Sequence, residues 1–91
     1  MSVTIRIPTP LRKMAGDKAE IVASGKTVRE ALESLRAAHP ELASRLFDDK
    51  GGLRRYVNFY LNERDIRDLS GAETPVKDGD VLTVMPAIAG G

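Results

Sequence analysis

Cysteine is absent from this chain, and only one histidine is present. Without a thiol there is no disulfide framework, no thiolate nucleophile and no cysteine-based metal site. The histidine, His39, precedes Pro40, where a helix is expected to end. One imidazole cannot assemble a metal cluster, so we interpret His39 as a helix-terminal residue that the helix dipole favours there. No metal site is therefore expected.

An excess of charge of one sign and long hydrophobic runs are also lacking. The formal net charge is +1, whereas nucleic-acid binding usually goes with a clear basic excess. No apolar run approaches the roughly 18 residues of a membrane-spanning helix, and the first residues lack the pattern of a signal peptide. The sequence therefore predicts one small cytoplasmic domain with neither a nucleic-acid nor a membrane partner.

Apolar residues that alternate with polar ones predict strands. Val3, Ile5 and Ile7 predict a first strand that ends at Pro8, and a weaker second strand is expected to pair with it as a hairpin. The expected strands are 3–7, 19–23, 55–61, a short edge strand beginning at Ile66, and 81–86. The expected connections include a loop over 11–17 that turns at Gly16, a loop over 48–52, and a tight turn over 78–80.

The clearest predicted element is a helix over residues 28–38. Thr27 and Glu30 have the spacing of a capping box, in which the hydroxyl and the carboxylate satisfy backbone N–H groups. Pro40 is expected either to stop the helix or to begin a further short turn. The apolar residues of the helix recur at helical spacing and predict one buried stripe: Val28, Ala31, Leu32, Leu35 and Ala38.

The order strand, strand, helix, strand, short strand, strand predicts an α+β fold. The first strand is expected to lie between the second and the last, in a mixed sheet of four to five strands packed on one main helix. That arrangement is the ubiquitin-like β-grasp. We expect it to span residues 1–86, followed by a flexible diglycine tail over 87–91.

Residue sets typical of enzymes are missing. There is no histidine base beside a serine and no phosphate-binding loop. The carboxylates of Asp48, Asp49, Asp78 and Asp80 fall in predicted turns, where acids are common for backbone reasons. A calcium loop needs more oxygen ligands at spaced positions. The sequence therefore predicts a protein that is not itself an enzyme.

The pair Gly90-Gly91 at the end of the sequence offers the chemistry instead. Two glycines fit a narrow channel because they carry no side chains, although an ordinary frayed terminus is the alternative. The carboxylate of Gly91, once joined to AMP, becomes an acyl donor. Attack by sulfur then gives a thiocarboxylate, and attack by a lysine gives an isopeptide bond. Either step needs a partner that supplies ATP and Mg²⁺.

Alternation in the last strand places Leu82 and Val84 in the core. Met85 and Tyr60 are then expected on the open face of the sheet near the tail. Met is suited to an adaptable binding surface, but it is equally compatible with packing at the sheet edge. The predicted partner surface comprises Met85, Tyr60, Asn58 and Thr83.

The chain resembles the ubiquitin-like sulfur carriers of the MoaD and ThiS group over nearly its whole length. The likeness lies in the capped helix, the segment VNFYLNERDIR, the turn DGD and the ending VLTVMPAIAGG. Within that group it is most similar to the CysO-type carriers of cysteine biosynthesis. VNFYLNERDIR, the ending MPAIAGG and the extended loop 47–55 carry that part of the resemblance.

The resemblance implies that an enzyme of the MoeB or ThiF kind adenylates Gly91, with Gly90, Ala89 and Ile88 threaded into its channel. It implies no cofactor bound by this chain, because ATP and Mg²⁺ come through the activating enzyme. The CysO branch implies two further partners, a PLP-dependent cysteine synthase and a JAMM-type metalloprotease. With the diglycine already terminal, no processing cut is expected.

The branches of this group share one fold and one chemistry, so other functions remain open. The chain is alternatively the small subunit of molybdopterin synthase, with the large subunit as its partner, or a carrier for thiamine or tRNA thiolation. A protein modifier joined to lysines and a plain interaction module are two further alternatives.

Overall fold

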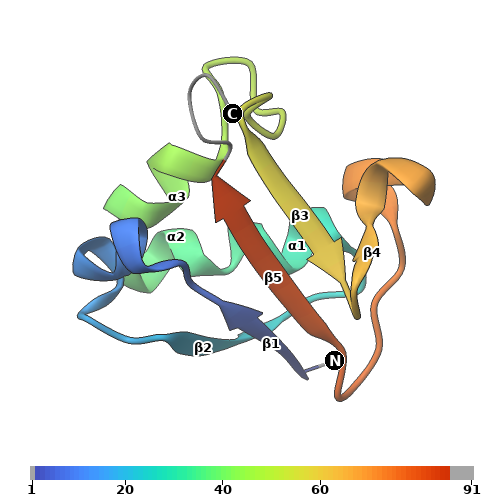
Figure 1. The fold of residues 1–91 in the computed structure, drawn as a ribbon, viewed down its shortest axis with the longest axis horizontal. Helices are drawn as coiled ribbons and strands as arrows, with labels where there is room; N and C mark the ends of the chain where they lie inside the picture. Colours follow the sequence, from blue (N-terminus) through green and yellow to red (C-terminus); the bar gives the residue numbers. More distant parts are fainter. Residues whose placement is uncertain (1, 87–91) are drawn as a thin grey trace.

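Five strands form one mixed sheet in the computed structural model, which describes residues 2–86 (Figure 1). The strand order is β2-β1-β5-β3-β4, with β1 and β5 parallel and every other pair antiparallel. The first strand lies between the second and the last, which confirms the predicted α+β, β-grasp arrangement. The strands are β1 (Ser2–Arg6), β2 (Glu20–Ser24), β3 (Val57–Leu61), β4 (Arg64–Asp65) and β5 (Val81–Pro86).

Three short helices, α1 (Val28–Glu33), α2 (Leu35–Ala38) and α3 (Pro40–Leu46), cover one face of this sheet (Figure 1). The predicted helix over 28–38 is therefore interrupted at Ser34. The Ser34 hydroxyl donates a hydrogen bond to the carbonyl oxygen of Ala31 at 2.7 Å, and such local bonds compete with regular helical bonding. α2 ends at Ala38, and Pro40 begins the separate helix α3, which is the second of the two predicted outcomes.

The N-terminus of α1 is capped much as the sequence predicts. The Thr27 hydroxyl accepts the backbone N–H of Glu30 at 3.2 Å. The Glu30 carboxylate reaches one residue further back than in a standard capping box and accepts the N–H of Lys26 at 3.0 Å. A Cβ on Gly25 would lie 2.6 Å from the backbone nitrogen of Ala31. Because it has no side chain, Gly25 allows the segment before α1 to lie very close to the backbone of that helix.

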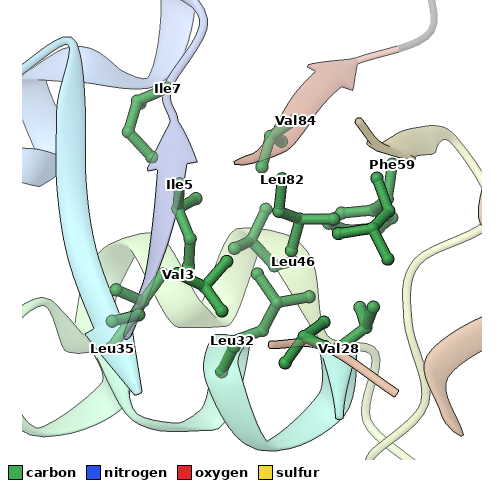
Figure 2. Close-up of a cluster of buried hydrophobic side chains, with 14 of the residues drawn as sticks. Val3, Ile5, Ile7, Val28, Leu32, Leu35, Leu46, Phe59, Leu82 and Val84 are labelled. Atoms are coloured by element: carbon green, nitrogen blue, oxygen red, sulfur yellow. The ribbon is translucent and has the colours of Figure 1, made fainter. Parts of the chain in front are cut away.

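The core lies between the helices and the inner face of the sheet (Figure 2). Leu32 is fully buried, and Figure 2 shows it among Val3, Val28 and Leu46. The predicted stripe is wrong at Ala38, which is exposed because α2 ends there. Leu42 and Leu46 of α3 continue the apolar side instead. The largest side chains that are fully buried are Ile5, Ile7, Leu32, Leu42, Leu46, Leu82, Val3, Val28 and Val84.

Two predicted connections have more structure than expected. The segment 11–17 belongs largely to a 3₁₀ helix, η1 (Thr9–Ala15). Pro10 lies in its first turn, and Gly16 follows its end at a φ of 65°. Proline is favoured in the first turn of a helix, and glycine tolerates the left-handed conformation just after its end.

The predicted edge strand at Ile66 is also displaced. The edge strand is β4, and Ile66 is a buried residue that begins a second 3₁₀ helix, η2 (Ile66–Asp68). A third, η3 (Gly71–Glu73), follows it. The Ile66 side chain joins the core cluster instead of continuing the edge strand, and its burial stabilises this turn. Strand β3 begins at Val57 rather than at residue 55.

The turn before β5 forms a buried polar network. Asp80 is only 6% exposed. Its carboxylate accepts the side-chain amide of Asn62 and the backbone N–H of Lys77, both at 2.9 Å. The Asn62 amide oxygen accepts the N–H of Val81 at 2.9 Å, and the Asn62 N–H donates to the Val81 carbonyl at 2.8 Å. The β3–β4 turn and the start of β5 are thus locked together.

We expect Asp80→Ala to lower the free energy of unfolding by about 1–3 kcal/mol, because it removes the charged acceptor of two part-buried hydrogen bonds, from Asn62 and Lys77. Urea denaturation measures the loss. Asp49→Ala is the matched control, since Asp49 is exposed and makes no hydrogen bond with any residue in 2–86. Equal denaturation midpoints for the two variants would show that the Asp80 network does not stabilise the fold.

Candidate functional site

Strand β5 leads directly into the predicted functional tail. Pro86 is the last described residue, and it pairs with Val57 of β3. The buried side chains of Leu82 and Val84 fix the strand to the core, as predicted. Ile88, Ala89, Gly90 and Gly91 lie outside the described residues, so their threading and activation stay predictions, as does the division of the chain at residue 86.

The structure brings the four residues of the predicted partner surface together on the open face of the sheet. Met85 pairs across the strands with Asn58, and Thr83 pairs with Tyr60. Met85 is 50% exposed, whereas the other three are half-buried. β5 lies between β1 and β3, but at Met85 it is paired only with β3, because the pairing with β1 ends at Thr83. Contact of this surface with a partner protein stays a prediction.

A further apolar residue on the same open face was not predicted. Val22 of β2 is 72% exposed and pairs with Thr4 of β1. Between Val22 and Met85 the face is polar, with Arg6 bound to Glu20 at 3.3 Å. The sequence shows that Glu20, Val22 and Ser24 share one face of β2. Whether that face points outward depends on the register of the hairpin, which pairs Val22 with Thr4.

Sequence reasoning also missed a basic groove at the tip of β5. The groove has a volume of about 720 Å³ and is lined by Pro86, Val57 and three arginines, Arg45, Arg54 and Arg55. We call it the strand-end groove. The adjacent letters LRRY at residues 53–56 are the local signal, but Arg45 comes from α3 and joins them only in the folded chain.

One acidic side chain, Asp48, lines the strand-end groove. Its Oδ1 atom accepts the backbone N–H groups of Lys50 and Gly52, both at 2.9 Å. These two bonds hold the pKa of the Asp48 carboxyl below its ordinary value, and the bond from Gly52 has the larger effect. The carboxylate thus stabilises its own turn, as predicted for the 48–52 loop.

Within residues 2–86, no three side chains of the types that bind metals are close enough to hold an ion. The helices in the same range are all too short or too polar to span a membrane. Neither finding bears on the residues beyond Pro86.

Comparison with known proteins identifies the group to which this chain is related. The model of the ThiS family matches residues 5–91. The chain belongs to the ThiS family. This member of the family is 41% identical, over the full length of both chains, to the sulfur carrier protein CysO of Mycobacterium tuberculosis. It is also 36% identical, again over the full length of both, to small archaeal modifier protein 3 of Haloferax volcanii.

Solved structures agree with this assignment. The ThiS-family chain superimposes on a chain of the Amycolatopsis orientalis BexX/CysO complex with a TM-score of 0.90 and 42% identity. The match covers 98% of this chain and 99% of that one. The β-grasp prediction and the resemblance to sulfur carriers are thereby confirmed. The relatives are named as carrier and modifier proteins, and this ThiS-family protein is likewise a small ubiquitin-like carrier rather than an enzyme.

Proposed function

We propose that this ThiS-family protein carries sulfur as a thiocarboxylate on Gly91 and donates it for cysteine biosynthesis. The observation that carries the proposal is the full-length 41% identity to a protein named sulfur carrier CysO, in a chain whose sequence ends in Gly90-Gly91. The attachment of β5 supports it, because β1 pairs with the first half of the strand and β3 pairs with it as far as Pro86, where the tail leaves.

The proposed chemistry has two steps. A carboxylate oxygen of Gly91 attacks the α-phosphorus of ATP, which forms an acyl adenylate and releases pyrophosphate. A sulfur nucleophile then attacks the acyl carbon and displaces AMP, so that one oxygen of the carboxylate is replaced by sulfur. Mg²⁺ on the activating enzyme neutralises the phosphate charges. This chain supplies the acyl group and no catalytic side chain.

The described residues serve as the handle in this scheme. Leu82 and Val84 hold β5 in the core, and the Asp80 network fixes the start of the strand. The position from which the tail departs is thus set by the fold. A fixed departure point increases the fraction of encounters in which Gly91 reaches the activating site.

The partners in this proposal follow from the CysO branch. An adenylating enzyme of the MoeB or ThiF type activates Gly91, a PLP-dependent cysteine synthase uses the sulfur, and a JAMM-type metalloprotease releases cysteine. All of these steps would take place in the cytoplasm. The structure in the comparison that contains both BexX and CysO supports a carrier that docks on other proteins.

The test is incubation of the purified protein with a cognate adenylating enzyme, ATP and a sulfur donor. Intact mass should show the exchange of one oxygen for sulfur, and a fragment spectrum should place the change at Gly91. Omission of ATP should prevent it. A carrier that remains unmodified under conditions in which a CysO control is converted would overturn the proposal.

A second candidate function, modification of other proteins through lysine isopeptide bonds, is favoured by one observation. The chain is 36% identical over its full length to small archaeal modifier protein 3. Tryptic digestion of proteins from cells that express a tagged carrier would reveal C-terminal remnants on target lysines. Such remnants on many targets would favour the modifier function over sulfur donation alone.

The substitution Met85→Glu tests whether the open face of the sheet binds the activating enzyme. The change places a charge on a half-exposed side chain that pairs with Asn58, so we expect the affinity for the activating enzyme to fall about tenfold or more. The melting temperature should change little, as for other surface substitutions. Titration calorimetry and thermal denaturation measure the two effects.

Leu69→Glu is the matched control, because Leu69 is 37% exposed and follows η2, away from the open face. It should leave the affinity nearly unchanged. Unfolding of the Met85→Glu protein would instead assign Met85 to the core, and equal affinities for the two variants would place the docking surface elsewhere.

A further inference from the structure

The strand-end groove lies where three segments that are distant in sequence meet. Figure 1 shows the tip of β5 beside α3 and close to the loop that precedes β3. Arg45 projects from α3, while Arg54 and Arg55 belong to that loop. Pro86, from which the tail departs, is part of the lining. The groove is therefore adjacent to the functional end of the molecule.

The groove gathers three of the five arginines that form no ion pair within residues 2–86. Arg45 and Arg55 are exposed, and their guanidinium groups form no ion pair or hydrogen bond with any residue in 2–86. Arg54 donates through Nε and Nη2 to the carbonyl oxygen of Ser44, at 3.1 and 3.0 Å. That contact orients its guanidinium but does not neutralise it. Four other arginines, by contrast, are paired with carboxylates: Arg6, Arg29, Arg36 and Arg67.

The groove therefore carries a positive charge that residues 2–86 do not balance. Three guanidinium groups face one carboxylate, that of Asp48, which already accepts two backbone N–H groups. The groove also offers apolar surface, since Tyr56 is 74% exposed and lies next to Val57. Arginine beside an aromatic ring is a combination that is enriched in protein interfaces.

The length of the tail limits how far from the groove the active site of the partner can open. Five residues follow Pro86, and an extended chain spans at most about 3.6 Å per residue. The carboxyl carbon of Gly91 therefore lies within about 18 Å of the strand tip. An active site that takes up this carboxylate therefore opens within that distance of Pro86, which itself lines the strand-end groove.

An entrance that covers the groove removes water from the arginines. Burial of an unpaired charge is unfavourable, so the covering surface must provide carboxylates. The planar guanidinium matches a carboxylate in a bidentate geometry. An apolar or basic entrance would leave Arg45 and Arg55 without partners.

We propose that the strand-end groove docks onto an acidic rim, made of aspartate and glutamate side chains, around the tail channel of the activating enzyme. This inference rests on the proposed function and adds a second contact region, distinct from the open face that bears Met85. Arg45 and Arg55 bind the rim carboxylates, and Arg54 is already oriented toward them by Ser44. Opposite charges also steer the carrier into the correct orientation during encounter.

The test uses charge-reversal variants, Arg45→Glu and Arg55→Glu, singly and together, with the cognate adenylating enzyme. Arg64→Glu is the matched control, because Arg64 is exposed on β4, at the opposite end of the sheet, and changes the net charge equally. ATP–pyrophosphate exchange as a function of carrier concentration gives KM and kcat. Thermal denaturation checks that each variant is folded.

We expect KM for the carrier to rise about tenfold for each single variant, as electrostatic steering allows, and further for the double variant. The kcat value at saturating carrier should stay unchanged, because Gly91 itself is intact. Added salt should raise KM for the wild type and for Arg64→Glu but lower it for the double variant, because salt screens the repulsion between its two glutamates and the acidic rim.

One outcome would overturn the docking inference and leave the proposed function standing: the wild type is adenylated, and the KM values are equal for Arg45→Glu, Arg55→Glu and Arg64→Glu. Failure of the wild type to be adenylated would overturn both. Arg55→Lys gives a further check, since it keeps the charge: a KM close to the wild-type value supports docking through charge.

Discussion

Deletion of Gly91 is expected to lower the rate of thiocarboxylate formation at least about 100-fold, because a displacement of even about 1 Å in a reacting group can have an effect of that size. The shortened chain still ends in a glycine carboxylate, but that carboxylate is withdrawn by about 3.5 Å. The fold should be unaffected, since the described core runs from Val3 to Val84. Intact mass measures conversion, and thermal denaturation measures stability.

Two variants serve as controls for this deletion. Extension of the chain by one serine beyond Gly91 should also prevent conversion, because the reactive carboxylate is then absent from Gly91. Gly90→Val keeps the length but should slow activation, since a β-branched side chain crowds a narrow channel and stiffens the backbone. An extended carrier that is converted as well as the wild type, without being trimmed, would contradict the carrier function.

Leu32→Ala is expected to lower the free energy of unfolding by about 2–5 kcal/mol. Leu32 is fully buried in α1, and Figure 2 shows it in the layer between the helices and the sheet. Truncation removes apolar surface from the core and leaves a cavity that its neighbours fill only in part. Because small domains have only about 5–15 kcal/mol of stability in total, a large share would be lost.

Leu69→Ala is the control for this loss, because Leu69 is partly exposed and its truncation should have a small effect. Chemical denaturation followed by circular dichroism measures both variants. A loss below about 0.5 kcal/mol for Leu32→Ala would contradict the assignment of the buried helix face.

The strands and the start of α1 could be predicted from the sequence because their signals are local. Alternation identifies β1 and β5, and with β5 it also predicts which of Leu82 and Met85 faces the core. The capping residues Thr27 and Glu30 mark the helix start within one turn. Met85 and Tyr60 could therefore be placed on one face before the structure was known.

Other features depend on contacts between distant segments and could not be predicted. The interruption at Ser34 involves a serine that is compatible with a continuous helix. Ile66 is drawn into the core by packing that its neighbours in sequence do not indicate. The strand-end groove requires α3 and the loop before β3 to meet at Pro86, and the adjacent arginines of that loop do not by themselves indicate that Arg45 joins them.

The position of β5 between two partner strands has a mechanical consequence. A partner that draws the tail into a channel applies tension to Pro86 along the axis of β5. The hydrogen bonds to β1 and β3 lie across that axis, so they are loaded together in shear rather than opened one after another. The domain is therefore expected to resist unfolding while a partner pulls on its C-terminal end.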